Sequence, residues 1–310
     1  MVSITDSESA PYEWTWSLKG HLMKTATERI LVLSLIAQTL AVGGCYSCAR
    51  SLRGAMAECK VEKSIRADFT PGSKLVIRDC DGAIRVWGED RTDCSVTAVA
   101  FIHAPTKGEA REIGEQLQLL AEPKDGTLVV SIRKPPMPQE HRFVSVDLDI
   151  VVPRSAAVDC ETSLGHAKLT AIEGDVKAST QLGSITCENI HGSLDLDTQL
   201  GRITCEGIVA DRIVAESQKG SIHISCADAC PPTVKADAST QWGKIRFIAP
   251  PHYQGAVEME SQMGSVKVGK VLDIQGTTRK SLMHGKVSGR IGSGAGSLHL
   301  SSNLGSVSLK

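Results

Sequence analysis

The chain has 310 residues, of which 41% are hydrophobic and 22% are charged, the proportions of an ordinary globular protein with a buried core. Its formal net charge is −1, which argues against a generic nucleic-acid binder, because such proteins carry a basic surplus. Aromatic residues make up only 4% of the chain, which weakens the case for a base-stacking surface or an aromatic platform for sugars.

Residues 1–44 have the layout of a secretory leader. A mostly apolar stretch, residues 30–42, follows two basic residues and is too short to span a bilayer. The sequence VGGC that ends at Cys45 resembles a bacterial lipobox, so we predict that Cys45 is acylated and anchors the exported chain to a membrane. The alternative is an ordinary signal peptide that is cleaved near Ala49. A start at Met23 would make the leader conventional, and we expect translation to begin there.

The next segment is strand-rich but irregular. Residues 45–60 are expected to form a tether, and residues 61–152 to form strands interrupted by one amphipathic helix over residues 106–121. Prolines border this helix, which is expected to cover a sheet edge or the end of the strand array. The apolar stripe of the predicted helix consists of Ala110, Ile113, Leu117 and Leu120. The strands expected here cover residues 93–102, 126–133 and 142–152.

Residues 153–310 repeat a frame of about 20 residues, which indicates stacked β units. Before each glycine of the frame, apolar residues alternate with polar ones and a hydroxyl residue follows, and after the glycine the parity of the alternation flips. We therefore predict strand, glycine corner, strand in every unit, with the glycine supplying the positive φ of a bend. The frame glycines are Gly165, Gly183, Gly201, Gly220, Gly243, Gly264, Gly285 and Gly305. The pattern around Leu75 and Gly82 is an earlier, less regular unit of the same kind.

The predicted fold is all-β: a single-domain parallel β-solenoid, or β-helix, over residues 61–310. The unit around Gly285 has Thr278 and Lys280 at apolar positions, so a distorted coil is expected there. The last coil ends at Leu309, which would leave an open edge, and an open edge predicts end-to-end self-association.

Fixed strand parity lets the outward side chains be read as rows along the array. The rows one and three residues after each glycine contain no acidic residue, whereas the opposite strand carries most of the acidic ones. Aligned cations of this kind could bind an anionic envelope polymer or lipid head groups, and the alternative is a charged face that is only solvated. The cations of this predicted basic stripe are Lys168, Arg202, Lys244, Arg246 and Lys267.

A second row lies two residues before the glycines. Amide side chains at one position of stacked strands can hydrogen-bond along the stack, so we predict an amide ladder, with saccharide binding as a further use of the row. The predicted ladder consists of Gln181, Gln199, Gln218, Gln241 and Gln262.

The sequence offers little support for catalysis. The histidines are scattered, no serine has a nucleophile context, and the paired carboxylates Asp195 and Asp197 have no accompanying groups. We therefore expect no enzyme activity, no cofactor and no metal site. Among the ten cysteines, Cys160, Cys187 and Cys205 fill inward positions that other units give to aliphatic residues or Phe, so free buried thiols are favoured over disulfides.

The chain resembles the bacterial putative adhesin family, whose function is not established. The resemblance rests on PGSKLVI from Pro71, GAIRVWG from Gly82, and the units TQLGSIT from Thr180 and TQLGRIT from Thr198, and it covers residues 60–310. It implies a β-solenoid that is exported or attached to a membrane, and it brings no catalytic residues.

The expected function is that of a lipoprotein at the cell envelope that acts as a non-catalytic binding or structural module. Its expected partners are the membrane that holds Cys45 and an anionic polymer, a glycan or a protein. The alternatives are a glycan-active β-helix enzyme and an envelope-stress accessory protein.

Overall fold

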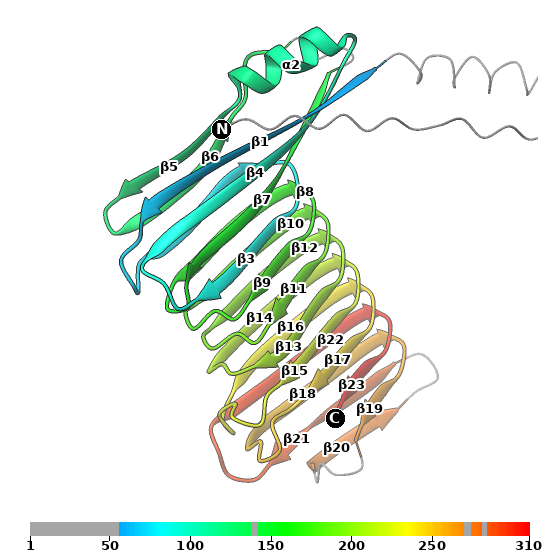
Figure 1. Cartoon of the computed structure of the whole chain (residues 1–310). Helices are drawn as coiled ribbons and strands as arrows, with labels where there is room; N and C mark the ends of the chain where they lie inside the picture. The colour runs from blue at the N-terminus through cyan, green and yellow to red at the C-terminus, as the bar shows by residue number, and fades with distance from the viewer. Residues whose placement is uncertain (1–55, 138–141, 270–273, 281–283) are drawn as a thin grey trace, which may run out of the picture.

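The computed structural model describes residues 56–137, 142–269, 274–280 and 284–310 (Figure 1). The leader, Cys45 and most of the tether lie outside the described residues. The described residues form two large β-sheets and one helix, which confirms the all-β expectation. Both sheets are mixed, because the eleven-stranded sheet has antiparallel strands at one end and the twelve-stranded sheet at both ends, so the expectation of a wholly parallel array is wrong.

The sheet with eleven strands is called sheet A here. Its first three strands pair antiparallel, and all later neighbours pair in parallel. In sheet order it consists of β1 (Ala57–Asp68), β4 (Asp93–Ala104), β7 (Phe143–Pro153), β3 (Ile84–Glu89), β9 (Ala167–Thr170), β11 (Ile185–Glu188), β13 (Ile203–Ile208), β15 (Ile222–Cys226), β17 (Ile245–Ile248), β23 (Val307–Leu309) and β19 (Val266–Val268).

The sheet with twelve strands is called sheet B. Its strands pair antiparallel only at the two ends: β20 with β21 and β21 with β18 at one end, and β5 with β6 at the other. In sheet order it consists of β20 (Gln275–Lys280), β21 (Gly285–Ile291), β18 (Gly255–Met263), β22 (Gly296–Leu304), β16 (Lys235–Trp242), β14 (Arg212–Lys219), β12 (Leu194–Leu200), β10 (Val176–Leu182), β8 (Ala157–Leu164), β2 (Lys74–Cys80), β6 (Thr127–Arg133) and β5 (Gln118–Lys124).

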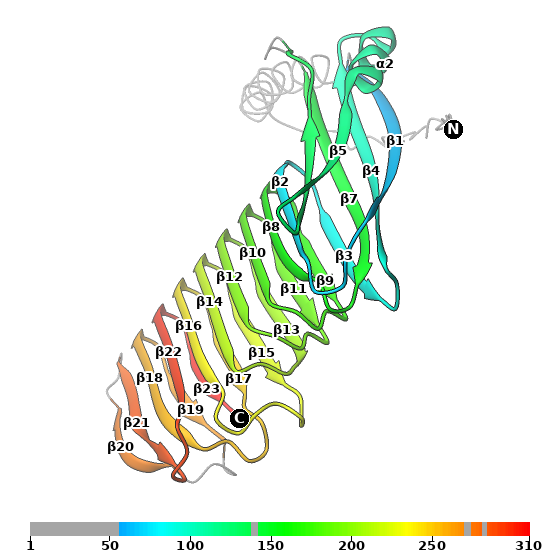
Figure 2. The same cartoon turned by 90° about the vertical axis from the view of Figure 1, so that its left-hand side faces the viewer.

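The middle of the molecule is a stack of two-strand repeats, each with one strand in sheet B and the next in sheet A (Figure 2). Frame-equivalent residues pair in register: Leu196 of β12 lies beside Ala178 of β10, and Cys205 of β13 beside Cys187 of β11. The alternation of buried and exposed residues along these strands produces one core between the sheets, because every second side chain points inward. The repeat containing Gly82 stacks on the one containing Gly165, so the array begins with β2 and β3 as expected.

The corners between the two strands of a repeat are held by a hydroxyl ladder. The buried residue three before each corner glycine donates its hydroxyl to the carbonyl of the adjacent repeat's glycine. For example, Thr198 Oγ1 lies 3.0 Å from the Gly183 oxygen, and Thr240 Oγ1 lies 2.9 Å from the Gly220 oxygen. The same bond recurs from Thr162, Thr180, Ser217, Ser261 and Ser302.

The corner glycines are required mainly by close approach. A Cβ on Gly201 would overlap the carbonyl oxygen of Gly183, and the same clash recurs at neighbouring corners. Among the described corner glycines only Gly165 and Gly305 have a positive φ, at 140° and 152°. The expectation that a positive φ explains every frame glycine is therefore wrong, because the adjacent backbone leaves no room for a side chain.

The C-terminal repeat is inserted rather than terminal. Strand β22 lies between β16 and β18, and β23 lies between β17 and β19 (Figure 2). Leu309 therefore lies inside sheet A, and in the described residues the edge strand at this end of the sheet is β19 rather than the last strand of the chain. The Gly285 unit is not a distorted coil, because β21 turns back and pairs antiparallel with β18.

At the other end, α2 (Lys107–Gln116) packs over β1 and β4 (Figure 1). The hydroxyl of Thr106 caps its first turn by accepting from the Glu109 N–H. The helix ends earlier than expected, because Leu117 takes an extended conformation and the following residues pair with β6 as strand β5. Leu120 therefore lies in a strand rather than on the helix stripe.

Candidate functional site

A row of exposed apolar side chains follows the corner where the chain passes from sheet B to sheet A. The residue before each corner glycine points outward, because the alternation of the sheet B strand ends with two successive exposed positions. The six apolar side chains of this row are between 41% and 58% exposed, with Trp242 the most exposed. We call this set the corner row: in sheet order it contains Leu164, Leu182, Leu200, Lys219, Trp242, Leu304 and Met263.

The one cation of the corner row continues its surface. The Lys219 Nζ lies 4.9 Å from the centroid of the Trp242 ring, a cation–π distance. The frame position one residue before each glycine is not among the predicted site residues. The sequence could have indicated this row, because Leu, Trp or Met recurs at a position that the alternation places on the surface, where polar residues are expected.

The predicted basic stripe lies directly beside the corner row, on sheet A. Lys168 is neutralised there, because its Nζ lies 2.9 Å from Glu188, a carboxylate of the same sheet face that the two predicted rows did not include. Arg202, Lys244, Arg246 and Lys267 are exposed, and the described residues contain no ion-pair partner for any of these four.

Hydrogen bonds from the backbone hold two of these cationic residues in place at the corner. The Arg202 N–H donates to Ser184 Oγ at 3.3 Å, and the Lys244 N–H donates to Ser221 Oγ at 3.3 Å. Arg202 and Lys244 thus occupy the same frame position as the serine of the adjacent repeat to which each is hydrogen-bonded.

The inserted repeat lies between two repeats that each combine an exposed apolar residue with a free cation. Trp242 and Lys244 share one repeat, Leu304 belongs to the inserted repeat beside it, and Met263 and Lys267 share the repeat beyond. Sequence order alone would place the Met263 repeat directly after the Trp242 repeat, so the position of Leu304 between them could not be predicted from the chain.

The predicted amide ladder is present as a row but differs in order and bonding. Gln181, Gln199, Gln218 and Gln241 follow one another along sheet B, and Asn303 of the inserted repeat then separates Gln241 from Gln262. In the part of the chain that the structure describes, no hydrogen bond joins these amides to one another. The hydroxyl ladder one residue earlier bonds across the repeats instead.

Most carboxylates on the acidic face of sheet B are paired with cations, and Asp197, Glu216 and Asp237 have no ion-pair partner among the described residues. The Asp159 carboxylate lies 2.8 Å from Lys74 and 2.9 Å from Arg78, and Asp195 lies 3.2 Å from Lys177. Lys286, one residue after the frame glycine Gly285, lies on sheet B, 2.8 Å from Glu258 and 3.3 Å from Glu260. The two faces thus differ in free charge as well as in composition.

Asp197 is the carboxyl of this face with a raised pKa. Burial raises the pKa, and the nearby Asp195 carboxylate raises it further. Asp197 lines a hollow of about 310 Å³ together with Glu216, Gln218, Gln241 and Asn303. Since Asp195 is paired with Lys177, the two predicted carboxylates of this face do not share one environment.

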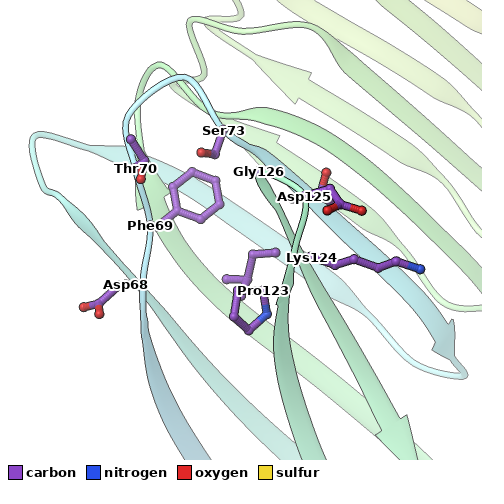
Figure 3. A pocket seen from close by; sticks show the side chains of 10 residues that line it. Asp68, Phe69, Thr70, Ser73, Pro123, Lys124, Asp125 and Gly126 are labelled. Atoms are coloured by element: carbon purple, nitrogen blue, oxygen red, sulfur yellow. The ribbon is translucent and has the colours of Figure 1, made fainter.

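Other features offer less defined chemistry. A hollow of about 190 Å³ lies between the loop after β1 and the turn from β5 to β6, where Phe69 and Pro123 stand near Lys124 and the carboxylates Asp68 and Asp125 (Figure 3). This is smaller than the roughly 300–1,000 Å³ that typical ligand pockets occupy.

The buried thiols have no assigned chemistry either. The eight cysteines in the described ranges are all free, and seven of them are buried. Burial raises the pKa of both Cys80 and Cys94 to about 12, so these thiols stay protonated at neutral pH. Within the described residues no cluster of three His, Cys, Asp or Glu side chains could hold a metal ion, and no helix is long and apolar enough to cross a membrane.

No protein-family model matches the chain, and no curated protein matches it. The chain is similar to a crystal structure described as a putative adhesin from Bacteroides fragilis NCTC 9343, with 14% identity, a TM-score of 0.41, and coverage of 80% of this chain and 97% of that one. It is also similar to a putative cell adhesion protein from Clostridium sporogenes ATCC 15579, with 13% identity, a TM-score of 0.34, and coverage of 80% and 99%. A putative adhesin from Parabacteroides distasonis ATCC 8503 is 11% identical, with a TM-score of 0.37 and coverage of 81% and 97%. Likenesses this low leave function to be argued from the chain's own residues.

Replacing Asp197 with Asn is expected to raise the stability of the fold at pH 7. Because the folded state raises the pKa of Asp197, folding disfavours its ionised form, and the wild-type chain loses stability as the pH rises from the unfolded pKa of about 4 towards the higher folded value. The gain should vanish well below the unfolded pKa, where the carboxyl is protonated in both states. Urea unfolding at neutral and acidic pH measures this difference, with Asp237→Asn, at an exposed position of the same face, as the control. An equal gain at both pH values would contradict the assignment.

Proposed function

We propose that the chain is an exported lipoprotein whose array is a β-solenoid of the adhesin-like kind and acts as a non-catalytic binding module at the cell envelope. In this proposal Cys45 carries the lipid anchor, and the stripe on sheet A binds an anionic envelope surface.

The observation that carries the proposal is the uneven pairing of charge on the two sheets. Four of the five predicted stripe cations have no ion-pair partner in the described residues. On the acidic face of sheet B most carboxylates, among them Asp159, Asp195 and Glu258, are paired with a cation of their own sheet, and Asp197, Glu216 and Asp237 have no partner among the described residues. Unpaired charges aligned along one face concentrate potential and attract a polymer or surface of opposite sign. A face that served only to keep the chain soluble would not require its cations to remain unpaired.

Removing the free cations is expected to weaken binding to anionic surfaces. The variant Lys244→Gln/Arg246→Gln/Lys267→Gln should lose roughly tenfold or more in affinity for immobilised polygalacturonate or for vesicles that contain phosphatidylglycerol, because each basic residue near such a surface contributes about 1 kcal/mol. Retention at increasing salt measures the loss. The matched control, Lys177→Gln/Arg212→Gln/Lys235→Gln, removes three cations from sheet B and should retain wild-type binding. Unchanged retention of the first variant on both surfaces would reject the binding role of the stripe.

The lipid anchor has its own test. Cells that express the full chain should incorporate labelled palmitate into it, and Cys45→Ala should abolish the label, because the acylated thiol is then missing. Label that persists in the Cys45→Ala chain would contradict lipidation at this residue, whatever the outcome of the binding assay.

A further inference from the structure

The corner row is a continuous ridge. Its members pair in register from Leu164 to Met263, at a spacing of about 4.8 Å between neighbouring strands, so six intervals give a row about 29 Å long. Both sheets bury their inner faces, and the corner where sheet B passes into sheet A therefore projects outward, along the edge of the stack seen in Figure 2. Six half-exposed apolar side chains along such an edge form a row of the kind that marks an interaction surface.

The flanks of the ridge are uncharged on one side and basic on the other. The sheet B flank consists of Ser163, Gln181, Gln199, Gln218, Gln241, Asn303 and Gln262. The sheet A flank consists of His166, Ser184, Arg202, Ser221, Lys244, Ser306 and Ser265. Neither flank contains a carboxylate, and on sheet B the nearest ones, such as Asp197 and Glu216, lie one outward position further from the corner.

We infer that the corner row inserts into the head-group region of a lipid bilayer that contains anionic lipids. Leu, Met and Trp side chains gain free energy when they enter the boundary between head groups and acyl chains, and Trp favours that depth. Lys219, Lys244 and Arg246 then lie where they can contact lipid phosphates, and Lys267 lies at the far end of the same ridge. This inference rests on the proposed function and names the surface that the basic stripe binds.

The shape of the ridge favours a bilayer over the other candidate surfaces. A convex apolar edge fits a fluid surface that can deform around it, whereas a folded protein would need a groove of matching length. A soluble anionic polymer would satisfy the cations but would leave the apolar side chains in water. The bilayer alone accounts for both the cations and the apolar row.

Trp242 provides a direct reporter. The chain has four tryptophans, so the full chain with Trp14→Phe, Trp16→Phe and Trp87→Phe keeps Trp242 as its only one. We expect brominated phospholipids to quench Trp242 fluorescence in mixed phosphatidylcholine and phosphatidylglycerol vesicles but not in phosphatidylcholine alone. In this background Lys244→Gln/Arg246→Gln/Lys267→Gln should reduce vesicle affinity roughly ten- to hundredfold. Met263→Ser/Leu304→Ser should reduce quenching, and Phe143→Ser, at an equally exposed position away from the ridge, should not.

Different outcomes overturn the inference and the proposed function. If the chain binds the vesicles through its cations and Trp242 is not quenched, the ridge does not enter the bilayer and the inference fails while the binding role stands. Charge-dependent retention on polygalacturonate without any binding to vesicles would likewise overturn the bilayer in favour of a polymer. If the cation variant binds both surfaces as the wild type does, the proposed function fails. Quenching that survives Met263→Ser/Leu304→Ser unchanged would also overturn the inference, because those side chains belong to the same ridge.

Discussion

The close contact between corner backbones of adjacent repeats is the constraint on which the rest of the structure depends. A glycine in one repeat lies against the carbonyl of the adjacent glycine, with no space for a Cβ, and a buried hydroxyl such as that of Thr198 satisfies the same carbonyl. A buried carbonyl without a partner would cost about 1–3 kcal/mol, so the hydroxyl and the glycine act together at each corner. This contact fixes the register, because a shift by one residue would bring a side chain into the space that only glycine leaves free.

Because the register is fixed, the residues at one frame position of successive repeats lie side by side and form one row on the surface. The hydroxyls form a buried ladder, the amides and the corner row form two outward rows beside it, and the cations begin immediately after the glycine. Each row therefore presents one kind of chemistry over the length of the array. The stripe of Lys244, Arg246 and Lys267 and the corner row meet at the corner, so a surface that binds the cations also reaches Trp242 and Met263.

Much of this arrangement could be predicted from the sequence, since it depends on short-range periodicity. The inward residues, the start of the array at Gly82 and the positions of the predicted cations follow from the frame. The insertion of the last repeat could not be predicted, because a strand such as β22 satisfies the same register beside β16 as β18 would. The neutralisation of Lys168 by Glu188 was missed because Glu188, on the adjacent repeat, stands at a frame position that the two predicted rows did not include. The Gly285 unit repeats the frame glycine, but its strand pairs antiparallel with β18, and the sequence does not encode that direction locally.

The most direct measurement of the corner contact is the unfolding free energy of the Gly201→Ala chain. Its Cβ would overlap the Gly183 carbonyl, which belongs to backbone and cannot swing away, so we predict a loss of about 4 kcal/mol or more, or no folding. Gly108 lies in α2 with no atom near the position of an added Cβ, and Gly108→Ala should change stability by less than about 1 kcal/mol. Equal, small changes for the two variants in urea unfolding would contradict the account, because the corners would then tolerate a side chain.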